Sequence, residues 1–280
     1  MSDLLIRNLR PEEISLAVDW AAAEGWNPGL ADAACFATPD PQGFFVGEID
    51  GEPVATVSCV NYDERFAFLG FYIVREDFRG SGHGLRIWNA AIAHAGARVI
   101  GLDGVVAQQD NYRKSGFQLA YANIRYGGIA AAPVKPPADV VTLDTIPLAL
   151  VETDDATVFP ARRSTFLRAW INTSGHVGRA LLRDGKLKAW GVIRPCRTGC
   201  KIGPLVADDR AAAEAIVQAL LPSAGGGEVF LDVPAVNPEA IALAATLGLK
   251  PVFETARMYT GPIAPLRIDR VFGVTSFELG

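Results

Sequence analysis

The feature of this sequence that most constrains its fold is a repeated order of predicted secondary structure. Residues 127–139 are rich in glycine, alanine and proline, which sustain neither a helix nor a central strand. On either side of them the predicted order is strand, helix, hairpin, strand, helix, strand, helix, strand, which is typical of a tandem duplication. The 280 residues are enough for two domains of roughly 100–200 residues each. We therefore predict a first domain over residues 1–130, a linker over 131–140 and a second domain over 141–280.

The individual elements are predicted from hydrophobic periodicity and from the positions of glycine and proline. In the first half, strands are expected at residues 4–8, 44–49, 54–60, 66–74, 98–102 and 117–126, and helices at 11–23, 32–36, 85–95 and 108–115. In the second half, strands are expected at 177–183, 188–193, 200–206 and 229–233, followed by further strands that end at residue 277. Helices are expected there at 156–171, 210–221 and 238–246.

Charge and cysteine content argue against several classes of function. The net charge of −5 gives no basic field that would hold nucleic acid or an anionic membrane surface. No apolar run approaches the roughly 18 residues of a membrane span, and the first residues lack the pattern of a signal peptide. Four cysteines do not make a disulfide framework, and Cys196 and Cys200 lack the second pair of a zinc site. We expect a cytoplasmic protein without a metal.

The acidic side chains are concentrated in the first half. Residues 1–132 carry 10 basic and 16 acidic side chains, whereas the remainder carries 16 basic and 15 acidic ones. An acidic excess suits a cationic ligand such as an amine, although a solvated acidic surface has the same composition.

The strongest chemical signal is the segment Arg79-Gly80-Ser81-Gly82-His83-Gly84, which lies between a predicted strand and a predicted helix. Glycines allow successive backbone N–H groups to converge on one point, and the start of a helix adds unpaired donors and the positive end of its dipole. Together these features predict a site for phosphate or pyrophosphate.

Two other phosphate-binding motifs fit this segment less well. The Walker A pattern GxxxxGK[ST] is absent. A dinucleotide-binding turn is a rival, because Asp103 follows at about the place of a ribose-binding acid. Two details count against it: the glycines begin several residues after the strand, and the third glycine of the fingerprint would fall on Ile87.

A better match is the GNAT superfamily of acyl-CoA-dependent N-acyltransferases. Arg79, Gly82 and Gly84 fit its pyrophosphate pattern [RQ]xxGx[GA], and Tyr112 with the following Gly116-Phe117 resembles its Tyr-x-x-x-Gly-Phe motif. The resemblance covers residues 4–126. It implies an α/β (α+β) class fold in which each domain is a mixed, mostly antiparallel sheet flanked by helices. The sequence departs from the family pattern at one point. Many members carry an asparagine early in the helix that precedes this tyrosine, whereas the nearest amide side chains here are those of Gln108 and Gln109.

The second half resembles the degenerate second unit of tandem members of the superfamily, the YitH/HolE-like type. Residues 24–29, 257–259, 272–274 and 278–280 also look like that subgroup. In place of the glycine loop stands the segment 206–210, in which Asp208 and Asp209 would repel a pyrophosphate. We therefore expect a single CoA site, formed by the first half, with the second half as a scaffold that also lines the acceptor pocket.

The resemblance also implies roles for individual residues. The pantetheine arm would lie along the strand that ends at Tyr72, Ile73 and Val74. The free N–H groups of this strand, near Ile73 and Val74, would polarise the thioester oxygen. The six residues 79–84 would bind the pyrophosphate, and Tyr112 would be the general acid for the leaving thiolate. The alternative for Tyr112 is a purely structural tyrosine packed at a helix end.

Acceptor binding is assigned to the segment after the first long helix. Glu24, Trp26, Asn27 and Asp32 lie where this fold places one wall of the acceptor pocket. An equally good alternative is a helix stop closed by Asn-Pro-Gly, with Trp26 in packing. The general base stays open among Glu24, Asp32, Asp63 and Glu64, with the alternative, favoured for Asp63 and Glu64, that these two are turn residues of a solvated hairpin.

These features predict an acetyl-CoA-dependent N-acetyltransferase that acts as a monomer or homodimer. A primary amine, most simply that of a small molecule, would attack the thioester directly in a ternary complex. Covalent catalysis is not expected, because no cysteine lies next to a histidine or in a nucleophile motif. The alternatives are a non-catalytic acyl-CoA-binding or sensing protein and, less favoured, a dinucleotide-binding protein.

Overall fold

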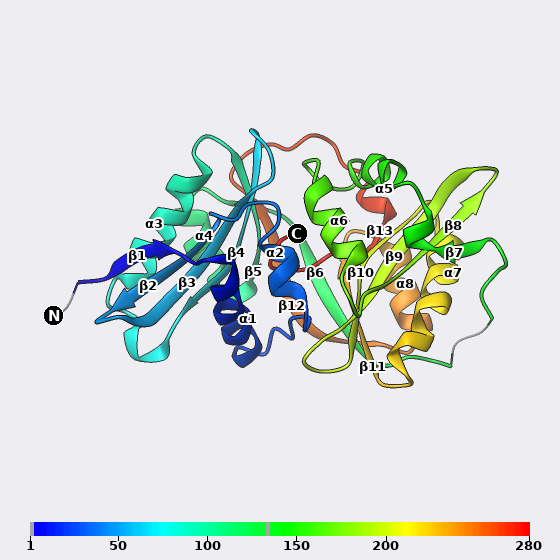
Figure 1. The fold of residues 1–280 in the computed structure, drawn as a ribbon, viewed down its shortest axis with the longest axis horizontal. Helices are drawn as coiled ribbons and strands as arrows, with labels where there is room; N and C mark the ends of the chain where they lie inside the picture. Colours follow the sequence, from blue (N-terminus) through cyan, green and yellow to red (C-terminus); the bar gives the residue numbers. More distant parts are fainter. Residues whose placement is uncertain (1–2, 133–134) are drawn as a thin grey trace.

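The computed structural model describes residues 3–132 and 135–280. All strands of this part of the chain belong to one sheet with the order β1-β2-β3-β4-β5-β12-β6-β11-β10-β9-β8-β7, and β13 pairs with β10. Figure 1 shows this sheet running through the whole molecule, with the first half of the chain at one end and the second half at the other. The sheet is mixed: β4 with β5 and β10 with β11 are parallel, and the other pairs are antiparallel.

The first half has the elements that its periodicity predicts, with ends shifted by a few residues. Its strands are β1 (Leu5–Asn8), β2 (Phe44–Ile49), β3 (Glu52–Asn61), β4 (Phe66–Val74), β5 (Val99–Val105) and β6 (Gln118–Ile129). Its helices are α1 (Ile14–Ala23), α2 (Asp32–Phe36), α3 (His83–Ala95) and α4 (Gln109–Lys114), and Pro11–Glu13 forms a 3-10 turn before α1.

The second half also contains most of the predicted elements. Its strands are β7 (Val140–Thr142), β8 (Val177–Arg183), β9 (Lys186–Pro195), β10 (Cys200–Ala207), β11 (Glu228–Pro234), β12 (Lys250–Tyr259) and β13 (Val271–Gly273). Its helices are α5 (Leu148–Asp155), α6 (Ser164–Asn172), α7 (Arg210–Leu220) and α8 (Pro238–Thr246).

Two predictions for the second half are wrong. The helix expected over 156–171 is interrupted, because Pro160 lacks a backbone N–H and the buried Arg163 turns back to bind Asp155 through two hydrogen bonds of 2.8 Å. The strands expected to end at residue 277 stop at Gly273. Residues 274–280 are instead a buried irregular segment, whose apolar side chains pack inside the molecule rather than in the sheet.

The two halves exchange strands in the middle of the sheet. β12, from the second half, lies between β5 and β6 of the first half, and β6 pairs on its other edge with β11. Figure 1 shows β6 and β12 at the centre of the molecule. Domain boundaries drawn along the sequence at 130 and 141 therefore cut between strands that belong to one sheet, and they stay a prediction.

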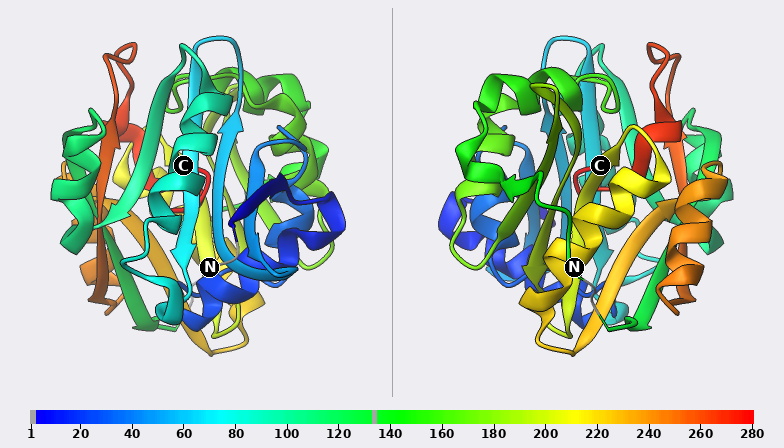
Figure 2. Two further views of the ribbon diagram at one scale, coloured as in Figure 1. Left: turned by 90° about the vertical axis from the view of Figure 1, so that its left-hand side faces the viewer. Right: turned by 90° about the vertical axis from the view of Figure 1, so that its right-hand side faces the viewer.

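The hydrophobic core is shared by both halves as well. Helices α1 and α2 pack with α5 and α6 in one cluster of buried side chains, in which the rings of Phe36 and Trp170 stack 6.1 Å apart. On the other face, α3 covers β2–β5, and α7 and α8 cover the second half of the sheet. The two end views of Figure 2 show helices on both faces. Helices thus bury both faces of the sheet.

The parallel strands β4 and β5 part halfway along their length. They are paired only from Phe66 to Leu69, opposite Val99 to Leu102. Beyond that point β4 carries one extra residue relative to β3, and Phe71 has a φ of +49°, which a non-glycine residue rarely adopts. The hydroxyl of Thr56 donates to the carbonyl oxygen of Phe71 at 2.9 Å, so this carbonyl group has a hydrogen-bond partner at the bulge. The sheet therefore opens between β4 and β5.

Candidate active site

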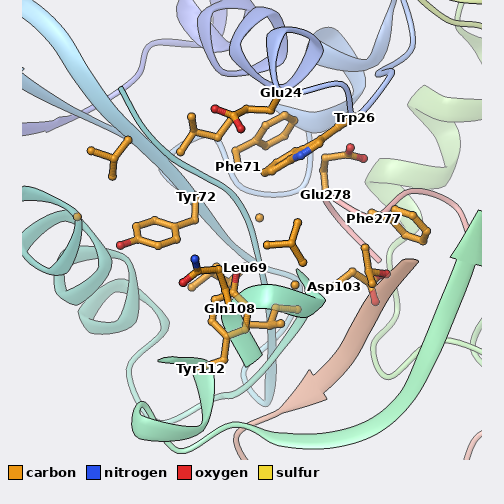
Figure 3. A pocket seen from close by; sticks show the side chains of 18 of the residues that line it. Glu24, Trp26, Leu69, Phe71, Tyr72, Asp103, Gln108, Tyr112, Phe277 and Glu278 are labelled. Carbon is orange, nitrogen blue, oxygen red and sulfur yellow. The ribbon is translucent and has the colours of Figure 1, made fainter. Parts of the chain in front are cut away.

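A cavity of about 500 Å³ lies where β4 and β5 part (Figure 3). This volume is within the range of sites for small molecules and cofactors. The walls come from the end of α1, from β4, from the glycine loop and the start of α3, from β5 with the turn and helix α4 after it, from β12, and from residues 277–278. Both halves of the chain thus contribute to one cavity, called the β4/β5 cavity below.

The loop before α3 has the backbone geometry of an anion site. Gly80 and Gly82 have φ values of +78° and +81°, which side chains other than glycine rarely allow. Gly82 is the cap residue of α3, a 13-residue helix, so the N–H groups of the first turn have no partner within the helix. Gly80, Gly82 and Gly84 all line the cavity. These donors and the positive end of the helix dipole favour an anion at this wall.

Arg79 ties this loop to two other walls. Its Nε donates to the carbonyl oxygen of Val74 at 2.9 Å, and its Nη2 donates to Oε1 of Glu24 at 2.9 Å. The guanidinium lines the cavity while about half of the side chain stays exposed (53%), so its charge remains accessible to a bound anion.

Gly84 lies where α3 comes closest to β4. A Cβ atom at this position would lie 2.5 Å from Oη of Tyr72 and 3.1 Å from Cγ2 of Val74, so only glycine fits without displacing them. The ring of Tyr72 in turn packs edge-on against Trp88 of α3, with 5.1 Å between the ring centres. The first turn of α3 is therefore held directly against the β4 wall.

The backbone of β4 presents a free edge to the cavity. The N–H of Arg75 donates to Val54 of β3. Because successive residues of a strand point to opposite edges, the N–H of Val74 points away from β3, toward the space that β5 has left. Tyr72, Ile73 and Val74 all line the cavity. This edge can hold an extended polar ligand in the manner of an added strand.

Tyr112 lines the cavity from the side of β5. Its ring lies on Gly104, where a Cβ atom would overlap the ring, and it stacks on Trp88 with 5.7 Å between centres. Burial raises the pKa of Tyr112 to about 12, and Tyr72 adds a smaller electrostatic contribution in the same direction. The hydroxyl therefore keeps its proton at neutral pH and can donate it to a developing negative charge.

The structure separates the four residues expected to bind the acceptor. Glu24 and Trp26 line the cavity, but Asn27 and Asp32 do not. Asp32 is fully buried, accepts a hydrogen bond from the N–H of Gly29 and forms an ion pair of 2.9 Å with Arg194 of β9. It joins the two halves of the molecule, and its placement in the acceptor pocket was wrong.

Asn27 has a structural role of the same kind. Its side chain accepts from the backbone N–H of Thr198 and donates to the carbonyl oxygen of Thr198, both at 2.9 Å. It adopts a positive φ of +52°, which asparagine tolerates better than most residues. Asn27 thereby anchors the turn after α1 to the β9–β10 hairpin instead of reaching into the cavity.

Other expected residues lie at the edge of the site or away from it. Ser81 is exposed and His83 half-buried, and neither side chain is part of the cavity wall. Asp63 accepts hydrogen bonds from the N–H groups of Arg65 and Phe66, so it shapes the turn between β3 and β4. Neither Asp63 nor Glu64 lines the cavity.

Several lining residues were missed from the sequence. They are an aromatic residue at the β4 bulge, two residues of β12 and two of the segment 274–280, namely Phe71, Phe253, Thr255, Phe277 and Glu278. No local motif marks them: Phe71 reaches the cavity through the bulge in β4, and the strand exchange and the folding-back of residues 274–280 bring the other four from distant parts of the chain. The only sequence signal was the similarity of residues 278–280 to the tandem subgroup.

Asp103, which the rival dinucleotide hypothesis required, has other partners. It lines the cavity, but its carboxylate accepts hydrogen bonds of 2.6 and 2.7 Å from Arg257 of β12 and one of 2.8 Å from Asn123 of β6. These bonds occupy the oxygens that would have to receive the ribose hydroxyls, which argues against a dinucleotide.

The loop before α7 in the second half corresponds to the glycine loop before α3, but it carries two aspartates that already have partners within the chain. Asp209 caps α7 by accepting from the N–H of Ala212 at 2.8 Å. Asp208 forms ion pairs of 3.0 Å with Lys188 and Arg270. The start of α7 is thus capped by the carboxylate of Asp209, and Asp208 beside it is held by two cations, whereas no side chain among the described residues caps the start of α3.

Comparison with known proteins places both halves in the same family. A family model described as the acetyltransferase (GNAT) family matches residues 8–117, and one described as an acetyltransferase (GNAT) domain matches residues 151–273. A holothin acyltransferase from a Pseudoalteromonas strain is 34% identical over 273 residues, which are 96% of this chain and 92% of that protein.

Two solved structures have the same fold over nearly the whole chain. A protein proposed to be an acetyltransferase from Pyrococcus horikoshii matches with a TM-score of 0.83 and 24% identity, covering 99% of this chain and 96% of its own. A tandem GNAT protein from the clavulanic acid biosynthesis pathway matches with a TM-score of 0.66 and 15% identity, covering 93% of this chain and 99% of its own.

Fold, cavity and relatives together define an acyltransferase with two GNAT domains in tandem. The chain belongs to the GNAT acetyltransferase family. Across residues 3–132 and 135–280, no helix is long and apolar enough to cross a membrane, and no three His, Cys, Asp or Glu side chains are grouped as a metal site would require.

Proposed function

We propose that this protein transfers an acetyl group from acetyl-CoA to a primary amine of a small molecule, by direct attack of the amine in a ternary complex. One observation carries the proposal. The anion-binding turn at the start of α3, the free edge of β4 and the protonated hydroxyl of Tyr112 all border a single cavity of about 500 Å³. These are the three elements that a CoA thioester needs: a pyrophosphate site, a partner for the pantetheine amides and a proton donor.

The residues present fit this cosubstrate. The glycine loop 79–84 offers N–H groups and the guanidinium of Arg79 to the pyrophosphate. The free edge of β4 at Val74 suits the amide groups of the pantetheine arm, and the N–H of Val74, which points away from β3, can stabilise negative charge on a thioester oxygen. Tyr112 lies on the β5 wall, where it can donate a proton to the sulfur as the acyl group leaves.

The acceptor would enter at the aromatic end of the cavity. Trp26, Phe71, Phe253 and Phe277 line it there and favour an acceptor with an apolar body. The name of the Pseudoalteromonas relative gives holothin as the acceptor of that protein, so holothin belongs in the first panel of amines to be tested.

Wild-type protein is expected to bind acetyl-CoA, and Gly84→Val is expected to weaken this binding by about ten-fold or more in calorimetric titration. The valine side chain would overlap Oη of Tyr72 and push into the space beside the glycine loop. Ala93→Val is the matched control, because it makes a β-branched substitution at an exposed site on the same helix.

The control should bind acetyl-CoA as the wild type does, and NAD should not bind to either protein. Failure of the wild type to bind acetyl-CoA would refute the proposal. Tight binding of NAD in its place would favour the dinucleotide hypothesis.

Trp26→Ala is expected to raise the KM for the amine by about ten-fold and to leave acetyl-CoA binding unchanged, because truncation removes an aromatic wall only at the acceptor end. Steady-state kinetics with the amine varied at saturating acetyl-CoA measures this. Leu30→Ala, at a residue that is 61% exposed in the following loop, controls for truncation of an apolar side chain. An equal rise in both KM values would show that Trp26 supports the whole cavity instead.

A further inference from the structure

Glu278 places an unpaired carboxylate in the wall of the β4/β5 cavity. Its side chain is 2% exposed, and neither Oε1 nor Oε2 has a hydrogen-bond partner within the described ranges 3–132 and 135–280. A buried carboxylate without hydrogen bonds is costly to the folded state, so a cationic or hydrogen-bonding partner from outside the chain would stabilise it.

The other two carboxylates of the cavity already have partners. Asp103 is held by Arg257 through two short hydrogen bonds, and Glu24 pairs with Arg79 at the exposed mouth. The base candidates outside the cavity, Asp32 and Asp63, are also engaged, in an ion pair and in a turn. Glu278 is thus the one carboxylate among the described lining residues whose oxygens are free to take a proton from a ligand.

The position of Glu278 is fixed close to the opening of the sheet. Its carbonyl oxygen lies against Gly70 of β4, where a Cβ atom would overlap it. Gly70 directly precedes Phe71, the bulge residue at which β4 departs from β5. Figure 3 draws Glu278 at the end of the cavity where Trp26 and Phe277 lie, with Tyr112 at the other end. The carboxylate therefore belongs to the acceptor side of the site.

Charged groups of four neighbouring elements act on this carboxylate. Burial raises the pKa of Glu278. Lys201 of β10, Arg125 of β6 and Arg194 of β9 oppose that rise, and Asp32 of α2 adds to it. These groups are themselves buried, and Arg125 and Arg194 are paired with Asp232 and Asp32. A carboxyl whose pKa lies above the ordinary range is better matched to proton transfer near neutral pH.

We propose that Glu278 is the general base of the reaction, which receives the ammonium group of the acceptor and removes its proton. The inference rests on the proposed acetyl transfer and adds the residue that makes the amine nucleophilic. An alkylammonium is almost wholly protonated at neutral pH, so attack on a thioester requires this loss.

The protons and electrons of the transfer balance as follows. One proton of the ammonium moves to Oε of Glu278, and the freed electron pair of nitrogen forms the new C–N bond. The C–S bond breaks with its electron pair on sulfur, which takes a proton from Tyr112. The nitrogen releases a second proton that restores Tyr112 through solvent, and Glu278 returns its own proton to water. The products are an acetamide, free CoA thiol and one proton.

Glu278→Gln tests the assignment, because it keeps the size of the side chain and removes the base. We expect kcat to fall by about 100-fold or more, acetyl-CoA affinity to stay within about two-fold of the wild type, and the acidic limb of the kcat/KM profile assigned to Glu278 to vanish. Glu239→Gln, at an exposed glutamate of α8, should retain wild-type kinetics.

Thermal unfolding gives a second readout that does not depend on turnover. The pKa of Glu278 is higher in the folded chain than its ordinary value of 4.5, so its protonated form favours the folded state. That stability is present below the unfolded pKa and is lost as pH rises through the folded pKa. The Tm of Glu278→Gln relative to wild type should therefore increase as pH rises above 4.5.

Three results would overturn the assignment of Glu278. They are a kcat within about three-fold of wild type, an unchanged acidic limb, or a Tm of the glutamine variant that drops relative to wild type as pH rises. The last would mean that the ionised carboxylate is a structural partner of Lys201 or Arg125. Absence of acetyl-CoA binding or thiol release in the wild type would instead refute the proposed function itself.

Discussion

Replacing Asp232 by alanine is expected to lower the free energy of unfolding by about 3–5 kcal/mol, because it removes the carboxylate that pairs with two buried cations. Asp232 is fully buried, accepts hydrogen bonds of 2.6 and 2.8 Å from Arg125, and lies 4.0 Å from Nζ of Lys201. Burial alone would raise the pKa of Asp232, but Arg125 and Lys201 hold it below its usual value. The ion pair of Asp232 with Arg125 joins β11 to β6, so its loss weakens the contact between the two halves of the chain.

Urea unfolding of Asp232→Ala beside Asp110→Ala measures this effect. Asp110 pairs with Arg113 on the surface, with 85% of its side chain exposed, and its loss should cost no more than about 1 kcal/mol. Equal stabilities of the two variants would contradict the claim that the buried cluster holds the halves together.

Tyr112→Phe is expected to reduce kcat by about 100- to 1,000-fold while acetyl-CoA affinity stays unchanged, because only the proton donor to sulfur is removed. The ring itself should keep its place, since its contacts with Gly104 and Trp88 do not involve the hydroxyl. Release of free thiol from acetyl-CoA in the presence of an amine gives the rate, and calorimetry gives the affinity.

Tyr126→Phe is the matched control for Tyr112→Phe, because Tyr126 is a buried tyrosine of β6 that packs in the core of the second half. It should retain the wild-type rate. A Tyr112→Phe enzyme with nearly full kcat would show that water or another group protonates the thiolate, and Tyr112 would then be a packing residue.

Local patterns predicted most of the first half correctly. The strand at Phe66–Val74, the glycine loop and the helix that follows were recognised because each depends on residues close together in the sequence. The family resemblance of residues 4–126 was confirmed by the match of the GNAT family model to residues 8–117. Glu24, Trp26 and Tyr112 were expected in the site, and all three line the same cavity, although their roles there stay predictions.

The features that were missed depend on contacts between distant parts of the chain. The sequence predicted that Asp32 binds the acceptor, but in the structure its carboxylate forms an ion pair with Arg194, which is 162 residues away. Phe253 and Glu278 reach the cavity only because β12 enters the first half of the sheet and residues 274–280 fold back over β4. Hydrophobic periodicity cannot predict contacts between distant segments, since it shows only which face of a helix or strand is apolar.

The exchange of β12 and β6 also has an evolutionary consequence. Deletion of the second copy would leave β5 and β6 with open edges, which invite aggregation. The second copy can therefore carry carboxylates in place of the glycines at the start of α7, but it cannot lose its strands. The two copies are inherited as one gene product, in which the copy without the glycine loop supplies strands that the other needs.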